Sequence, residues 1–337
     1  MVASDVHRLH AGFELHDGAF VESFESPFRA DVIAAALRSA GHDFRTPEPV
    51  DLDLLRRVHT AEYVDFLANA WRRWVERGEA GPAAMGHTWP ARGFSDRRPD
   101  DLIGQLGYHS FAADSTIVDG TWTAAAESAA LATTAADLVA DGAGVAYALC
   151  RPPGHHAMRD QFGGYCYLAN SAIAAQRLLD RGMDTVAVLD VDYHHGNGTQ
   201  QIFEDRADVF TISIHADPVD EFPWFSGFAD ETGTAGGEGR NLNLPLPRHT
   251  DMEEWMAALD VALDRLRGAG VDALVVALGV DTHVDDPLGT FRLETHDFTE
   301  AARRVARLDR PTVVVQEGGY ANDALGTNVG AFLDGLG

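Results

Sequence analysis

The most constraining feature of the sequence is a set of five short apolar runs, each of which ends in a polar cluster. The runs are rich in Val, Ile and Leu, and they are apolar on both faces instead of alternating. This pattern is typical of central strands in a parallel sheet, because both faces of such a sheet are covered. The five predicted strands are Gly144–Leu149, Val186–Val191, Val209–Ile214, Ala273–Val280 and Thr312–Gln316.

Helical stretches lie between these runs. The alternation predicts an α/β fold, with a central, mostly parallel sheet flanked by helices, in a single domain over residues 1–337. We expect Asn170 or Ser171 to cap the helix that follows them. Residues 78–120 show little periodicity and contain several Pro and Gly, so they are predicted to form a long loop insertion. The predicted helices are Arg29–Ala40, Asp51–Arg77, Thr121–Ala140, Asn170–Arg181, Asp251–Arg267 and Thr295–Leu308.

The polar clusters predict one convergent site. In an open parallel sheet, ligands bind outside the carboxyl ends of the strands. A single polar ending would be ordinary, but here five strand ends carry His, Asp, Glu or Tyr. The clusters are residues 150–156, 192–198, 215–217, 281–283 and 317–320.

Asp192, His194 and Asp281 are candidate metal ligands. Residues two apart in an extended segment point the same way, so Asp192 and His194 project together. Asp281 follows another strand and supplies a third ligand. One imidazole and two carboxylates with open positions are typical of a catalytic metal, which polarises a carbonyl and acidifies water.

His155, His156 and Tyr320 are candidate catalytic residues. The histidines follow Pro152-Pro153-Gly154, which fixes a non-helical turn, and histidine suits proton transfer near neutral pH. The Tyr320 phenol is a candidate donor to a developing oxyanion. No Gly-x-Ser-x-Gly elbow and no Gly-x-Gly-x-x-Gly after a strand occur, which argues against an acyl-enzyme nucleophile and against dinucleotide binding. These residues together predict metal-assisted hydrolysis of an amide or ester.

Charge limits the partners. The chain has 52 Asp+Glu against 26 Lys+Arg, a net charge of −26, and every base is Arg. Nucleic acid and anionic membrane surfaces are therefore excluded as expected partners. The acidity is consistent with steering of a cationic substrate or with adaptation to a salty interior. With two cysteines, no signal peptide and no long apolar run, we expect a cytoplasmic protein.

Six motifs occur in order along the chain: RPPGHHA (151–157), GGYCYLANSAIAAQ (163–176), DVDYHHGNGTQ (190–200), SIH (213–215), ALGVDTH (277–283) and EGGY (317–320). Together they resemble the histone deacetylase superfamily. The resemblance implies its arginase/deacetylase-like fold, with the active site at the carboxyl ends of the strands. Within the superfamily, SPFRADVI at 26–33 and FGGYC at 162–166, among others, make the chain most similar to bacterial acetylpolyamine amidohydrolases.

The resemblance implies a catalytic zinc ion on Asp192, His194 and Asp281. It implies that His156 is the general base and acid and His155 an electrostatic helper. It also implies roles for residues around these groups. These are Asp190 and Asn197 behind the two histidines; Tyr320 on the scissile carbonyl; Gly164, Tyr165 and Phe222 along the acyl tunnel; Asp114 facing the distant ammonium; and a structural monovalent cation, potassium, on Ser213 with carbonyls of Asp190, Asp192, His194 and Ile214.

The resemblance further implies a homodimer formed through residues 78–120 and a small cationic N-acetylated amine as substrate. The function predicted is therefore zinc-dependent deacetylation of acetylated polyamines or related N-acyl alkylamines. Two alternatives stay open: a protein acetyl-lysine deacetylase or acetoin-utilisation-type deacetylase, and a non-hydrolytic binding protein or sensor for acylated amines. A two-metal arginase-like hydrolase is disfavoured, because His195, Gly196 and Asn197 stand where further ligands are needed.

Overall fold

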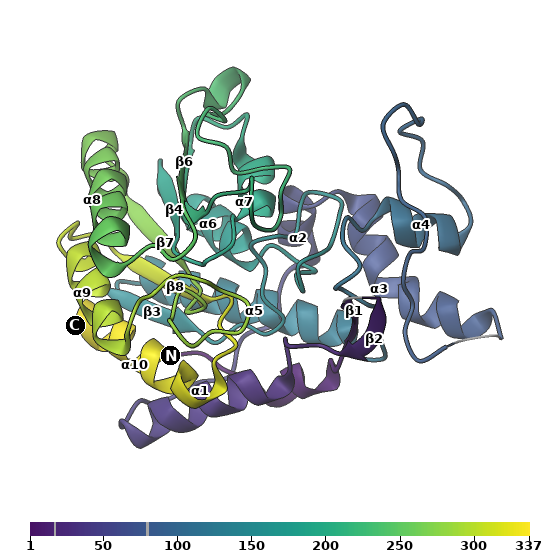
Figure 1. Cartoon of the computed structure of the whole chain (residues 1–337), viewed down its shortest axis with the longest axis horizontal. Helices are drawn as coiled ribbons and strands as arrows, with labels where there is room; N and C mark the ends of the chain where they lie inside the picture. The colour runs from purple at the N-terminus through teal and green to yellow at the C-terminus, as the bar shows by residue number, and fades with distance from the viewer. Residues whose placement is uncertain (17, 79–80) are drawn as a thin grey trace.

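The computed structural model describes residues 1–16, 18–78 and 81–337. A six-stranded sheet lies at the centre of the molecule, with helices around it (Figure 1). All neighbouring strands of this sheet are parallel, in the order β3-β8-β7-β4-β5-β6. The predicted fold is therefore confirmed. The strands are β3 (Val145–Ala148), β4 (Val186–Asp190), β5 (Val209–Ala216), β6 (Asn241–Leu246), β7 (Ala273–Leu278) and β8 (Thr312–Gln316).

Helices cover both faces of the sheet, which explains why its strands are apolar on both sides. Val186 and Val188 of β4 pack into one hydrophobic core, and Ala187 and Leu189 pack into the other. The first core is closed by α2 (Leu52–Val58), α3 (Ala61–Glu76), α5 (Thr121–Ala140) and α6 (Asn170–Asp180), and the second by α1 (Pro27–Ser39), α8 (Met252–Ala269), α9 (Thr295–Ala306) and α10 (Asn322–Leu336).

Two local predictions were wrong. Residues 51–77 form two helices, because the chain turns at His59 and Thr60. The Thr60 amide donates to Arg159 O at 2.9 Å, and its hydroxyl accepts from Tyr63 N at 3.3 Å to start α3. No side chain caps α6, whose N-cap is Ala169.

Several short elements were not predicted. Residues 78–120 include α4 (Leu102–Tyr108), which lies at one end of the molecule (Figure 1). Near the N-terminus, β1 (Phe13–His16) and β2 (Ala19–Glu22) form an antiparallel hairpin. The sixth strand, β6, lies at the sheet edge. The other elements are α7 (Asn197–Phe203) and the 3₁₀ helices η1 (Asp5–Leu9) and η2 (Ala235–Gly237). The division into one domain with an insertion stays a prediction.

The strand order reverses beside β4. The chain runs from β4 to β5 and β6 on one side, then crosses back to place β7 on the other side of β4. Such a reversal opens a crevice at the carboxyl ends of the two strands, where ligands of open α/β sheets bind. Among the described residues, no helix has the length and apolar character needed to cross a membrane.

Candidate active site

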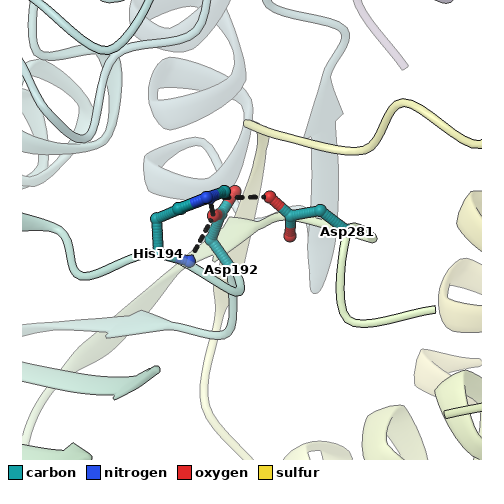
Figure 2. A group of neighbouring side chains, drawn as sticks. All are labelled: Asp192, His194 and Asp281. Carbon is teal, nitrogen blue, oxygen red and sulfur yellow. Dashed lines mark hydrogen bonds and ion pairs between the residues drawn. The ribbon is translucent and has the colours of Figure 1, made fainter. Parts of the chain in front are cut away.

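Asp192, His194 and Asp281 meet just past the carboxyl ends of β4 and β7 (Figure 2). His194 Nδ1 lies 3.3 Å from Asp192 Oδ1 and 3.2 Å from Asp281 Oδ2. Both carboxylates are fully buried and accept backbone N–H groups: Gly318 N binds Asp192 Oδ2 and Tyr193 N binds Asp281 Oδ1, both at 2.8 Å, and His194 N binds Asp192 Oδ1 at 2.9 Å. Asp192 Oδ1, Asp281 Oδ2 and the imidazole converge, as predicted.

This cluster fits a divalent metal ion. Burial and the neighbouring Asp192 charge raise the pKa of Asp281 to about 7, because two buried carboxylates face each other in this cluster. Zinc bonds of 2.0–2.1 Å in tetrahedral geometry place ligand atoms about 3.3 Å apart, close to the distances from His194 Nδ1 to the two oxygens. The structure therefore supports the predicted metal site.

Two glycines allow the carboxylates to lie against the backbone. A Cβ at Gly279 would stand 2.0 Å from Asp192 Oδ2, and one at Gly318 would stand 2.4 Å from Asp281 Oδ2. Neither position has room for a side chain, so the motifs ALGVDTH and EGGY need glycine where they have it.

The tandem histidines lie beside this cluster and have different partners. His155 Nδ1 is 2.9 Å from Asp190 Oδ2, and His156 Nδ1 is 2.6 Å from Asn197 Oδ1. Asn197 Nδ2 donates to His156 O at 3.4 Å, which leaves the amide oxygen to accept from His156 Nδ1–H. His156 therefore carries its proton on Nδ1 and has a free lone pair on Nε2.

The two imidazoles are held in opposite charge states. Burial opposes charge on His155, but the carboxylates of Asp192 and Asp190 outweigh it and raise its pKa well above the usual value. Burial, the adjacent His155 and His194 lower the pKa of His156 well below the usual value. A neutral His156 is suited to accept a proton, and a charged His155 places positive charge beside it.

Tyr320 faces the same space with its backbone fixed. Asp286 Oδ2 accepts from Tyr320 N at 2.6 Å and from Ala321 N at 3.0 Å, and the Arg29 guanidinium lies 4.6 Å from the centre of the tyrosine ring. Burial raises the pKa of the Tyr320 phenol well above its usual value, although Arg29 opposes this. The hydroxyl therefore keeps its proton and remains a donor.

The predicted tunnel residues lie around these groups. Phe222 stands edge-on to His156 at 4.9 Å between ring centres, and Tyr165 stands edge-on to Tyr320 at 5.9 Å. Asp114 accepts from Gly164 N at 2.8 Å, so its carboxylate supports the turn on which Tyr165 is carried. The roles of these side chains towards a substrate stay predictions.

The residues predicted to hold a monovalent cation are adjacent in the sheet. Asp190 and Ser213 are register partners on β4 and β5, and both are buried. Ser213 Oγ lies 2.8 Å from His215 Nδ1. The predicted cation site, which also includes Ile214, therefore lies directly behind the candidate metal ligands.

Comparison with known proteins gives the family. Residues 23–336 match the histone deacetylase domain. The chain belongs to the histone deacetylase family. The acetylpolyamine amidohydrolase of Mycoplana ramosa is 46% identical over 338 residues, covering 100% of this chain and 99% of that protein. Acetylpolyamine amidohydrolase 1 of Pseudomonas aeruginosa is 48% identical over 340 residues, covering 99% and 97%.

Solved structures of related proteins support the same family. The crystal structure of acetylpolyamine aminohydrolase from Burkholderia pseudomallei has a TM-score of 0.95 at 38% identity, covering 100% of this chain and 98% of that one. The HDA15 HD domain has a TM-score of 0.83 at 26% identity, covering 99% and 90%. The resemblance seen in the motifs is confirmed, and the chain is a hydrolytic deacetylase of this family. The roles of individual site residues stay predictions.

Four side chains near the site were not singled out from the sequence. Arg29 and Glu317 lie in the quoted motifs SPFRADVI and EGGY, and Asp286 lies just past ALGVDTH. Glu14 lies in the β1–β2 hairpin and is buried. The pKa of the Tyr165 phenol is raised mainly by the burial of Tyr165 and also by the Glu14 carboxylate. Arg29, Asp286 and Glu317 thus stand in or beside quoted motifs and Glu14 does not, and the contacts of these side chains come from distant segments.

Proposed function

We propose that this protein is a zinc-dependent deacetylase of acetylated polyamines or related N-acyl alkylamines, which releases acetate and the free amine. The observation that carries the proposal is the convergence of Asp192, His194 and Asp281 beside a neutral His156 and a protonated Tyr320. The polyamine relatives that match over nearly the full chain favour this substrate class.

Asp192, His194 and Asp281 would hold the zinc ion. When bound, zinc supplies Lewis-acid chemistry, polarising a carbonyl and acidifying water. His156 Nε2 accepts a proton from the attacking water, because its Nδ1 is already committed to Asn197, and then returns a proton to the leaving amine. The Tyr320 hydroxyl donates to the developing oxyanion, and the His155 charge stabilises the same negative charge.

Side-by-side assays test this proposal. Zinc-loaded protein is given acetylputrescine, acetylspermidine and an acetyl-lysine peptide, and kcat/KM is measured for each. We expect preference for the acetylated polyamines and loss of turnover after chelation, with recovery on adding zinc back. A preference for the peptide would move the assignment to a protein deacetylase. Binding of the amines without hydrolysis would indicate a sensor.

We also propose that potassium occupies the site around Asp190 and Ser213. A cation bound to the native state alone stabilises it. Unfolding temperatures are compared in potassium chloride and in a bulky organic chloride at equal ionic strength. Equal temperatures would contradict a potassium site.

We further propose a homodimer formed through residues 78–120. Phe94 in this segment is 68% exposed, and an interface between two copies of the chain would cover this aromatic side chain. Light scattering after gel filtration should give a dimer mass, and Phe94→Ser should lower it. Val261→Ser, at an exposed position on α8, is the matched control. A monomer mass for the unchanged protein would contradict the proposal.

A further inference from the structure

Glu317 is a buried carboxylate that joins three segments next to the candidate catalytic groups. It follows β8, and it is fully buried. Oε2 accepts from Gly154 N at 2.6 Å and from His155 N at 3.1 Å, and Oε1 accepts from Ser171 Oγ at 2.8 Å. Every partner donates, so the side chain serves as an acceptor on both oxygens.

Burying this carboxylate is costly. Burial raises the pKa of Glu317 to about 7, although nearby His155 and the Gly154 amide act in the opposite direction. An ionised group in the interior is tolerated only when hydrogen bonds satisfy it. Ser171 also lies in the first turn of α6, where the helix dipole favours negative charge. The site is therefore built to keep an acceptor in this place.

The bonds of Glu317 fix His155 from its backbone side. The His155 ring is held by Asp190 and its carbonyl accepts from Gly198 N at 3.0 Å and Thr199 N at 3.2 Å. Glu317 supplies the acceptor for the remaining backbone polar group, the N–H. Hydrogen bonds thus reach His155 at its amide, its carbonyl and its ring.

The same residue belongs to the turn that carries Tyr320. The Glu317 carbonyl accepts from Arg29 Nη2 at 2.7 Å, and Gly319 O accepts from Arg29 Nε at 2.6 Å. The backbone of Glu317 is therefore anchored to α1 while its side chain reaches the histidine turn. Among the described residues, the bonds from the Gly154 and His155 amides to Glu317 are the most direct link between the histidine turn and the Tyr320 turn.

We propose that Glu317 is a positioning residue that holds the turn of His155 and His156 at a fixed distance from the turn of Tyr320. It acts through hydrogen bonds to the Gly154 and His155 amides and does not touch the substrate. The inference rests on the proposed function, since it assumes that these turns carry the reacting groups. It extends that function by naming the contact that sets their spacing.

Two substitutions of Glu317 distinguish the loss of its hydrogen-bond acceptors from the loss of its negative charge. Glu317→Gln keeps one oxygen for the two amides, and its NH2 can donate to Ser171 Oγ, which accepts as well as donates. Glu317→Ala leaves both amides without a partner. We expect Ala to lower kcat by about 10- to 100-fold, because misplacement near 1 Å has effects of this size. We expect kcat of Glu317→Gln to stay within about fivefold of the unchanged protein, because a neutral hydrogen bond replaces a charge-assisted one.

Other readouts exclude a merely structural effect. The Glu317 side chain bonds Gly154, His155 and Ser171 and not the candidate metal ligands, so we expect KM and the zinc dissociation constant to stay within about twofold in both variants. Asp297→Ala is the matched control: this buried carboxylate accepts from Glu294 N at 2.8 Å at the start of α9, so its loss lowers stability without lowering kcat. Ser171→Ala removes only the third bond and should lower kcat less than Glu317→Ala does.

The outcomes are distinct. Unchanged kcat in Glu317→Ala, or an equal loss in the Gln and Ala variants, would overturn the proposal, the second because charge and not position would then be the cause. If Glu317→Ala does not fold, the Glu317→Gln and Ser171→Ala variants test the proposal instead. A large loss of kcat in Glu317→Gln would then overturn it. Absence of turnover by the unchanged protein with the three substrates contradicts the proposed function itself, and this inference with it.

Discussion

Tyr320 shows how a single side chain is prepared at the residue scale. Its backbone is fixed by Asp286, its ring lies against Arg29, and burial keeps its hydroxyl protonated. Tyr320→Phe removes only the hydroxyl, so we expect kcat to fall by about 100-fold or more, as for other oxyanion donors. Steady-state kinetics measure this loss, and the unfolding temperature should not drop. Unchanged kcat would remove Tyr320 from the mechanism.

Gly164 is required for a steric reason. Its φ is +58°, and a Cβ there would stand 2.3 Å from His156 Cδ2. Gly164→Ala should therefore displace the His156 ring and lower kcat by about 10-fold or more. Gly270→Ala is the matched control, because Gly270 has a φ of +67° but open space around it. Equal effects of the two substitutions on kcat would show that backbone strain, and not the contact with His156, is responsible.

Residue identities near the metal cluster could be predicted from the sequence, because spacing on a strand decides which side chains project together. Asp192 and His194 are two apart, and they do converge. Arg29 and Asp286 could not be assigned in the same way. Their partners lie in the turn that carries Tyr320, distant from Arg29 in sequence, and no periodicity links the segments.

At the element scale, α1 is attached to the active-site turn through Arg29. This buried guanidinium pairs with Glu25 at 2.7 Å and donates to Glu317 O and Gly319 O. Arg29→Met removes the donor to these acceptors and leaves Glu25 paired with Arg151 alone, at 3.0 Å, so we expect a loss of about 3 kcal/mol in the free energy of unfolding, the lower end for a broken buried pair. Urea denaturation measures it.

The same helix offers a control for that prediction. Arg38→Met changes an exposed arginine near the end of α1 and should alter the free energy of unfolding by less than about 0.5 kcal/mol. A comparable loss of unfolding free energy in Arg29→Met and Arg38→Met would mean that the contacts of Arg29 with the active-site turn do not contribute specifically to stability.

Strand positions were predictable, because buried parallel strands have an unmistakable apolar pattern. Edges were not. In β6 the sequence NLNLPL alternates and includes Pro245, which is tolerated only where a strand lies at a sheet edge. The break between α2 and α3 was also missed, because His59 and Thr60 are turned by bonds to Met158 O and Arg159 O, far along the chain.

At the scale of the whole molecule, the net charge of −26 has a testable consequence. If the acidity steers a cationic polyamine, kcat/KM should fall as the Debye length shrinks from about 10 Å at 0.1 M salt to about 3 Å at 1 M. The measurement is kcat/KM for acetylputrescine across this range. A neutral N-acetylated amine serves as control and should show a flat response. A rise with salt would indicate adaptation to a salty interior instead.

Buried neutral histidines link stability to pH. Burial lowers the pKa of His59 to about 4, while its ring bonds Met158 O and Ala169 N. Between about pH 6.5 and 4 the unfolded chain binds a proton at this position and the folded protein does not, so the stability that neutral His59 gives is lost as pH falls. His59→Gln lacks this titration.

We therefore expect the stability gap between the unchanged protein and His59→Gln to shrink by up to roughly 3 kcal/mol as pH falls from 7 towards 4. Urea denaturation at pH 7, 6 and 5 measures the gap. A gap that does not vary with pH would contradict a buried neutral His59.

The sequence alone determined the parallel sheet, the edge at which the site lies and the candidate metal-binding cluster. Apolar runs and residue spacing are local properties, and parallel topology turns them into a shared edge without further information. Tertiary structure decided how the catalytic turns are held. Glu317, Asp286 and Arg29 bind backbone groups of segments that meet only after the sheet has formed, because hydrogen-bond partners of a buried charge are set by proximity in space and not by sequence.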